Sequence, residues 1–319
     1  MLRTIRPLAA FVGVFLPLFG CARYPYRVSI DAAPWIRALG SDELFESDPA
    51  ENKLVNLGPE AVPLLETALE REPAPVRVGV IGVLGRLQLP EAEALLLRAA
   101  ANDPDEEVRY EAVFALGNLK GLRRGQVAEA ALDDSSARVR MVAVQQCATL
   151  CSSPAAIGRV VQIAIHDPAP HNWGWARLTL SAILNEDPKI PRAAEAKAAI
   201  EQQARPLLAS GDTYGERTRA ALLLAQVGDP AAEPVLVQAV RAGEGQSGRP
   251  HAVYALGEVG DRDAVPVLTD RLGSPDAMTV SYSYDALRKL ADRGVPGAAA
   301  ALKAYTGPVP PRGLPPPPP

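Results

Sequence analysis

The chain has 319 residues, enough for one extended domain or two ordinary ones, and 48% of them are hydrophobic. Only 5% are aromatic, which suits closely packed short helices better than β-sandwiches, because sandwiches depend on aromatic and β-branched residues. The formal net charge is −4, and an acidic chain of this kind argues against nucleic-acid binding, which normally requires a basic stripe.

The N-terminal segment has the three-part layout of a signal peptide. Residues 1–6 carry two arginines and no acid, and residues 7–19 form an apolar run. That run is too short to cross a bilayer, which takes ~20 residues. A charged start, a short apolar middle and a small residue before the cut are typical of signal peptides. Gly20 is the small residue here, and Cys21 follows it directly.

The sequence from Leu18 to Cys21 resembles the lipobox of bacterial lipoproteins. The resemblance implies removal of residues 1–20 as a lipoprotein signal peptide and acylation (palmitate) of Cys21, with several acyl chains giving a stable anchor. Ala22 is not an aspartate, which by the same resemblance favours the outer membrane, facing the periplasm. The alternative is an ordinary signal peptide followed by an unrelated cysteine. Residues 21–56 are expected to form a lipid-anchored linker and an N-terminal cap.

An eleven-residue pattern occurs four times along the chain, beginning at Pro59, Pro90, Pro230 and Arg262. Each copy has an alanine at its third position, and apolar residues follow three, four and mostly eight positions later. This spacing places the apolar side chains on one face of an amphipathic helix. A second helical segment follows each copy, most clearly between residues 108 and 117.

The second helical segments share an aligned arginine, at Arg77, Arg109, Arg140, Arg217 and Arg249. Together the two patterns resemble HEAT-like repeats of the phycobilisome-lyase type, and we assign residues 57–306 to a HEAT-like repeat domain. The resemblance implies an all-α fold, an α-solenoid in which about seven antiparallel helix pairs stack into a superhelix with an extended concave face. The alternative is a generic helical bundle with chance similarity.

In the HEAT-like family the aligned arginine usually pairs with an acid from the preceding loop or from the next unit. The resemblance therefore implies a structural arginine ladder, with Asp105 and Asp134 as natural partners, in preference to a row of ligand-binding side chains.

Residues 166–175 contain two of the three histidines and two of the three tryptophans. We expect an ordered loop in place of the usual inter-helix loop, with its tryptophans capping a gap in the stack. A second interpretation is a partner-binding hot spot made of His171, Trp173 and Trp175, because tryptophan is enriched at such sites. A metal site using the histidines and Asp167 is a third, but their spacing matches no recognised ligand pattern, so no metal is assigned.

Cys147 and Cys151 are one helical turn apart. Helix geometry disfavours a disulfide at that spacing, and Cys147 aligns with Leu116, an expected core position. The sequence therefore predicts a buried thiol, although an oxidising compartment would leave room for pairing.

The chain ends in a proline-rich segment, residues 307–319, which is expected to be a disordered tail of polyproline II character. It is either a solvated spacer or a ligand for an aromatic groove on a partner.

These features predict a membrane-tethered protein-interaction scaffold of the bacterial cell envelope, which binds a protein partner of unknown identity through its concave face and needs no cofactor. The alternative is a HEAT-like enzyme, lyase-related or metal-dependent, with its site near residues 166–175. The family includes bilin lyases, whose cytosolic substrate conflicts with export, and a di-iron hydroxylase, which needs repeated His-Glu pairs. None of the three histidines precedes a glutamate, and no Ser-His-Asp grouping or Walker loop stands out. We therefore expect no enzymatic activity.

Overall fold

The computed structural model describes residues 31–41, 43–119, 124–187, 190–211, 214–242, 249–311, 313–315 and 317. Throughout these residues the regular secondary structure is helical, and the helices pair as the repeats predicted. The outer helices are α3 (Val62–Arg71), α5 (Pro90–Asn102), α7 (Arg124–Ala131), α9 (Pro154–His166), α11 (Pro191–Ala204), α14 (Glu233–Arg241) and α16 (Ala264–Arg271). Their inner partners are α4 (Ala74–Leu87), α6 (Glu106–Asn118), α8 (Ala137–Cys147), α10 (Pro170–Leu184), α13 (Tyr214–Gln226), α15 (Arg249–Val259) and α17 (Ala277–Asp292).

Six further elements of the described residues complete the array. They are α1 (Ala33–Ala38) and α2 (Leu44–Asn56) at the start, the 3₁₀ turns η1 (Gly58–Ala61) and η2 (Pro230–Ala232), α12 (Leu207–Ser210), and α18 (Ala298–Ala304) at the end. The expected all-α solenoid is therefore confirmed. Residues 1–20 and Cys21, which carry the predicted signal peptide and lipid anchor, lie outside the described residues.

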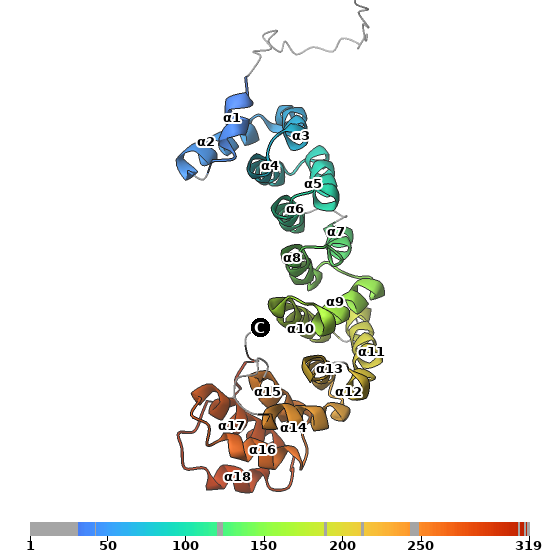
Figure 1. Ribbon diagram of the computed structural model, residues 1–319, viewed down its shortest axis with the longest axis vertical. Helices are drawn as coiled ribbons and strands as arrows, with labels where there is room; N and C mark the ends of the chain where they lie inside the picture. The colour runs from blue at the N-terminus through green and yellow to red at the C-terminus, as the bar shows by residue number, and fades with distance from the viewer. Residues whose placement is uncertain are drawn as a thin grey trace, which may run out of the picture.

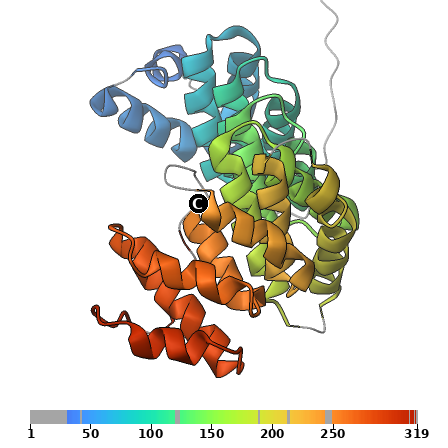
Figure 2. The same cartoon turned by 60° about the horizontal axis from the view of Figure 1, so that its bottom comes forward.

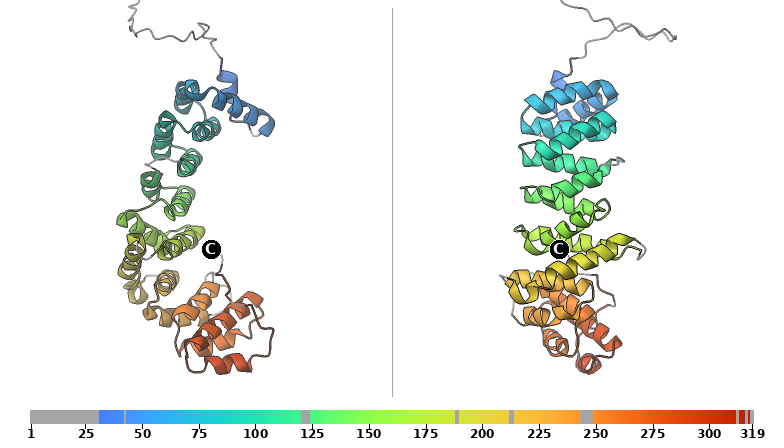
Figure 3. Two further views of the ribbon diagram at one scale, coloured as in Figure 1. Left: turned by 180° about the vertical axis from the view of Figure 1, so that it is seen from behind. Right: turned by 90° about the vertical axis from the view of Figure 1, so that its right-hand side faces the viewer.

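The stack is curved, so one row of helices lies on its concave side and the other row on its convex side. Figure 1 shows the inner helices α4, α6, α8 and α10 along the concave side and the outer helices α3, α5, α7 and α9 along the convex side. In Figure 2 the N-terminal (blue) and C-terminal (red) helices lie on the same side of the central (green and yellow) ones, and the reverse view in Figure 3 shows the same curvature. The concave face is therefore built from the second helix of each repeat.

Local sequence signals set where the helices begin. Asp105 caps α6, because its Oδ1 accepts a hydrogen bond from the backbone N–H of Glu107 at 2.9 Å, and such a cap is worth ~1 kcal/mol. Ser153 caps α9 in the same way. Proline occupies the first position of α5, α9, α10 and α11, where its missing N–H would have had no helical partner.

One continuous hydrophobic core runs through the array between its two rows of helices. Outer helices contribute Leu65, Leu96 and Ile157, and inner helices contribute Leu84 and Leu116, all of them almost completely inaccessible to solvent. Each such side chain contributes about 1.5–3 kcal/mol of transfer free energy. Because each unit packs mainly on its neighbours, the repeats depend on one another for burial.

The pairing of the two cysteines differs from the expectation, because Cys147 and Cys151 form a disulfide. The prediction of a free thiol assumed that both residues belong to one helix. Instead α8 ends at Cys147, and the chain then turns so that the two Cα atoms lie 4.4 Å apart, within the range that a disulfide needs. Both residues are buried, which agrees with the core position inferred for Cys147.

Candidate functional site

The segment that contains the two neighbouring tryptophans is helical, contrary to the predicted ordered loop. Helix α9 ends at His166, and α10 begins at Pro170, so only three residues connect the two helices. Asp167 stabilises this short turn by accepting a hydrogen bond from the N–H of Ala169 at 2.8 Å. Pro170 marks the helix start, because proline is favoured in the first helical turn.

His171, Trp173 and Trp175 consequently project from the first turns of α10 in different directions. His171 is exposed, whereas both tryptophans are half-buried and pack against the core. The indole of Trp173 meets the imidazole of His251 edge to face, with ring centroids 5.4 Å apart. The structure thus joins Trp173 on α10 to a histidine on α15, a contact that the sequence analysis did not anticipate.

Three of the five aligned arginines make the same contact with an aspartate of the following repeat: Arg77 with Asp103, Arg109 with Asp134, and Arg140 with Asp167. In each pair two guanidinium nitrogens donate to two carboxylate oxygens at 2.7–3.0 Å. A third nitrogen donates to a backbone carbonyl at the preceding helix–helix turn. These arginines therefore tie each inter-helix turn to the next, and they are half-buried within the turns.

The other two aligned arginines do not extend this series in the described part of the structure. Arg217 of α13 forms none of the described ion pairs, and Asp229 is held instead by Arg205, with Nη2 2.6 Å from Oδ2. The side chain of Arg249 lies outside the described residues. Asp105, which the sequence analysis predicted as a partner of the aligned arginines, caps α6 instead.

An aromatic patch lies on the N-terminal half of the concave face, and the sequence analysis missed it. Phe114 is 49% exposed, and its ring stacks on that of Tyr110 one turn earlier, with centroids 6.5 Å apart. The guanidinium of Arg138 covers Tyr110 at 4.6 Å. Because α6 packs between α4 and α8 with α5 behind it, the exposed ring of Phe114 faces the concave side. A large apolar side chain exposed on a concave surface is what a partner would cover.

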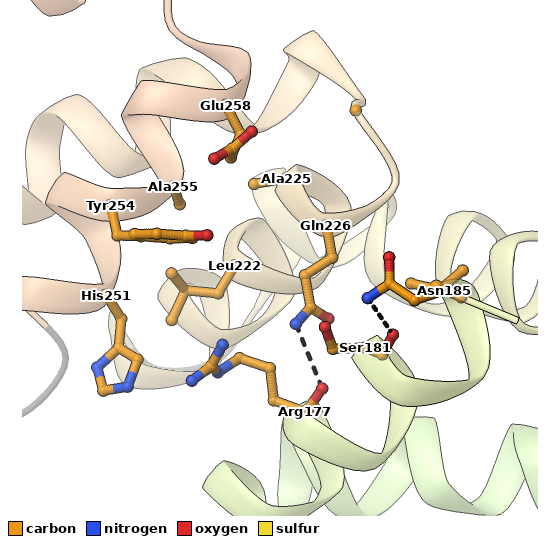
Figure 4. A pocket seen from close by; sticks show the side chains of 12 residues that line it. Arg177, Ser181, Asn185, Leu222, Ala225, Gln226, His251, Tyr254, Ala255 and Glu258 are labelled. Atoms are coloured by element: carbon orange, nitrogen blue, oxygen red, sulfur yellow. Dashed lines mark hydrogen bonds between the residues drawn. The ribbon is translucent and has the colours of Figure 1, made fainter. Parts of the chain in front are cut away.

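A pocket of about 330 Å³ opens between α10, α13 and α15 on the same face (Figure 4). Arg177, His251 and Tyr254 lie at one end of it, and the guanidinium of Arg177 extends toward His251. At the other end Gln226 donates to the backbone carbonyl of Arg177 at 3.2 Å, which ties α13 to α10. The pocket therefore combines aromatic walls with hydrogen-bond donors.

Arg177 is the most unusual residue of this pocket, because its side chain is charged and the residue is only 6% exposed. Burial lowers the pKa of Arg177, and nearby Tyr254 offsets part of this effect. Within the described residues its Nε has no hydrogen-bond acceptor, while its Nη2 donates to the backbone carbonyl of Pro317 at 3.4 Å. Sequence analysis could have found this residue as a charge within the apolar stretch of α10, between Ala176 and Leu178.

The partner of Arg177 belongs to the proline-rich segment, which returns to the concave face. Pro317 is buried, and Leu314 packs against the hydrophobic core. Arg288 of α17 donates from Nη2 to the carbonyl of Pro311 at 3.3 Å. The tail thus passes α16, α17 and α18 at residues 307–311 and reaches the Arg177 end of the pocket at Pro317.

Two kinds of site are not seen among the residues that the structure describes. No three His, Cys, Asp or Glu side chains gather there in a way that could hold a metal ion. His166, one of the histidines considered as a metal ligand, lies beside Glu216, with its Nδ1 2.6 Å from the carboxylate Oε1. None of the described helices is both long and apolar enough to span a bilayer.

Comparison with solved structures agrees with this architecture. The Escherichia coli protein YibA superposes with a TM-score of 0.51 at 15% identity, over 90% of this chain and 100% of that one, a likeness that shows the fold alone. Human deoxyhypusine hydroxylase in complex with glycerol (TM-score 0.32, 19% identity, 82% and 96% coverage) is more distant. So is the complex of CpcE and CpcF of phycocyanin lyase from Nostoc sp. PCC7120 (0.28, 22%, 60% and 96%). Neither supports an argument about function.

Comparison with protein families gives a clearer answer. No curated protein matches the sequence significantly. The family model for HEAT repeats, however, matches residues 61–146 and 201–288, which together exceed half of the chain. Solenoids of this kind present extended concave surfaces for protein interaction. On the strength of the repeats, the helix pairing and this match, the chain belongs to the HEAT-repeat family.

Proposed function

We propose that this protein is a membrane-tethered scaffold of the bacterial cell envelope, which holds a protein partner on its concave face, and that it is not an enzyme. The observation that carries the proposal is the pair of binding features on that face. They are the exposed aromatic patch of Tyr110 and Phe114 on α6 and the pocket between α10, α13 and α15. Buried aromatic and arginine side chains supply most of the energy in protein interfaces.

The disulfide supports the compartment in this proposal. Disulfides persist in oxidising environments such as the bacterial periplasm and are rare in the cytosol. The buried bond between Cys147 and Cys151 fits a chain that is exported. It agrees with the lipobox resemblance at Cys21, from which the proposed anchor comes.

The anchor is tested by fractionation. Full-length protein and a Cys21→Ala variant are expressed in the native host, and membranes are separated from soluble fractions. We expect the wild-type chain in the outer-membrane fraction and the variant in the soluble periplasmic fraction. A variant that still sediments with membranes would refute the lipid anchor.

The binding face is tested by co-purification in mild detergent followed by mass spectrometry. We expect one or two envelope proteins in near-equal amounts, with Phe114→Ala reducing their recovery at least fivefold. The matched control is Arg98→Ala on the outer helix α5, because Arg98 is also about half exposed but lies on the other row of helices. A Trp173→Ala, Trp175→Ala double variant is compared at the same time, with its thermal melt recorded because both side chains pack on the core. Equal losses from α5 and α6 variants, or no loss from either, would reject the concave face.

A further inference from the structure

The proline-rich tail of the chain lies at the edge of the pocket between α10, α13 and α15, because Arg177, which lines the pocket, donates a hydrogen bond to the carbonyl of Pro317. We propose that the Arg177 end of this pocket and the surface between Arg177 and Arg288 form a binding site for proline-rich segments, covered by the tail in the isolated protein and by a proline-rich segment of the partner in the complex. The inference rests on the proposed use of the concave face for binding. It does not depend on the lipid anchor.

The hydrogen bonding of a proline-rich ligand fits the donors on this face. Proline has no N–H, and a polyproline II chain makes no internal hydrogen bonds, so its carbonyl oxygens remain free to accept. A surface that binds such a chain must supply donors. Two arginines do so here: Arg177 donates to the carbonyl of Pro317 at 3.4 Å and Arg288 to that of Pro311 at 3.3 Å. The arginines thus contact the ligand backbone near both of its ends.

Apolar and aromatic side chains lie near these donors. Pro317 is buried and Leu314 packs against the core. The pocket wall contains Tyr254 and His251, and the ring of His251 meets that of Trp173 edge to face, with centroids 5.4 Å apart. Grooves that recognise proline-rich segments are typically lined by aromatic side chains of this kind.

The state of Arg177 explains why the site favours being occupied. A buried charge is costly unless it is hydrogen-bonded, and within the described residues the Nε of Arg177 lacks an acceptor. The carbonyl of Pro317 is the acceptor that its side chain does have there. Removing the tail would leave the guanidinium without that acceptor until another ligand supplied one.

Covalent attachment gives the tail an advantage over any free ligand. A short flexible connection produces an effective concentration of about 1 mM. If the open pocket bound a free proline-rich peptide with a Kd of about 10 μM, the attached tail would weaken the apparent affinity roughly 100-fold. The tail therefore competes with any partner for the site, and only a tightly binding or multivalent partner displaces it.

The test uses the full chain and a fluorescent peptide with the sequence of residues 307–319. Leu314→Asp and Pro317→Asp are introduced together, which keeps the chain length and releases the tail. Fluorescence anisotropy should show the peptide binding this tail-released chain at least tenfold more tightly than the wild-type chain. Adding Arg177→Gln to the tail-released chain should weaken its affinity for the peptide at least tenfold, whereas adding Arg98→Gln on the outer helix α5 should leave that affinity unchanged.

Changes in the peptide keep the test decisive even if Arg177→Gln disturbs folding. Replacing every proline of the peptide by alanine should abolish binding, while amidating its C-terminus should leave binding intact. Equal affinity of wild-type and tail-released chains would overturn the proposal. So would binding that survives the proline replacements but requires the free carboxylate, because the pocket would then be an anion site.

Failure of this inference can be told apart from failure of the proposed function. If a partner co-purifies equally with the wild-type and tail-released chains, and the peptide does not bind, the scaffold stands without this ligand. If the peptide binds as expected but no protein co-purifies, the pocket stands and the scaffold function falls.

Discussion

Arg140 and Asp167 are joined by two parallel hydrogen bonds, from Nε to Oδ2 at 2.7 Å and from Nη2 to Oδ1 at 3.0 Å. The Asp167 side chain is only 2% exposed, and its Oδ1 also accepts from the N–H of Ala169 in the turn before α10. The pair therefore fixes α8 against the start of α10. One of these two helices, α10, also lines the pocket on the concave face.

Breaking this pair should be costly. Arg140→Gln removes the partner of a buried carboxylate, and such changes destabilise by about 3 kcal/mol or more. The matched control is Arg159→Gln, which breaks an ion pair with Asp133 whose side chains are 46% and 61% exposed. Exposed pairs contribute less than about 1 kcal/mol. Urea denaturation of the two variants should separate them clearly, and equal losses would contradict a special role for the buried pair.

The aspartates of the buried arginine–aspartate pairs should make the free energy of unfolding fall in acid. Burial opposes ionisation of Asp134 and Asp167, but the hydrogen bonds and charges of Arg109 and Arg140, together with backbone N–H donors in each turn, outweigh it and lower both pKa values below the usual 3.8. In the unfolded chain these carboxyls bind protons at a higher pH than in the folded one. Their contribution is therefore complete above pH ~4 and is lost as the pH falls through the lowered folded pKa values.

Asp134→Asn provides the check on this linkage. The difference in unfolding free energy between wild type and variant should be largest at neutral pH and should shrink below pH ~4, when the wild-type carboxyl becomes protonated. Urea titrations at pH 7, 4 and 3 measure it. A difference that stays constant across this range would mean that the carboxylate charge does not contribute.

The disulfide should stabilise the chain by a modest amount. It closes a very short loop, since four positions separate Cys147 from Cys151, and the loop-entropy relation gives about 2 kcal/mol for a loop of this size. Reduction, or Cys151→Ala, should lower the melting temperature accordingly. Mass spectrometry of the unreduced peptide that spans both cysteines should show the loss of two hydrogens, and free thiols in protein from the native host would contradict the bond.

Two glycines of α4 should respond oppositely to alanine. An added Cβ at Gly79 would lie 2.6 Å from the backbone oxygen of Leu39, whereas at Gly82 the nearest atom is a Glu51 carboxylate oxygen at 3.8 Å. Alanine is favoured over glycine in helices by about 1 kcal/mol. Gly82→Ala should therefore raise the melting temperature, and Gly79→Ala should lower it by pushing α1 away from α4. The same sign for both would show that α1 does not pack as described.

The sequence by itself determined the repeat architecture. Apolar spacing, capping residues such as Asp105 and prolines at helix starts are local signals, and each repeat packs mainly on its neighbours, so local patterns suffice to predict the stack. The aligned arginines also follow from the repeat, which is why the sequence predicts Asp134 as a partner in the ladder, and the structure pairs it with Arg109.

Features that depend on where a helix stops were harder to predict. The cysteines pair because α8 ends at Cys147, before the chain reaches Cys151. The segment around Trp173 is helical because Pro170 is the first residue of α10 and not part of a longer loop. In both places a shift of the helix boundary by a few residues reverses the interpretation, and helix boundaries are weakly encoded by composition.

Only the tertiary structure decided which side chains meet on the concave face. The hydrogen bond from Arg177 to Pro317 joins residues 140 positions apart, and Trp173 meets His251 across helices of different repeats. Such contacts arise from the small rotation that accumulates between successive repeats and curves the array. No pattern within one repeat encodes that sum, so the pocket and the contact of the proline-rich tail at its edge follow only from the arrangement of the helices in space.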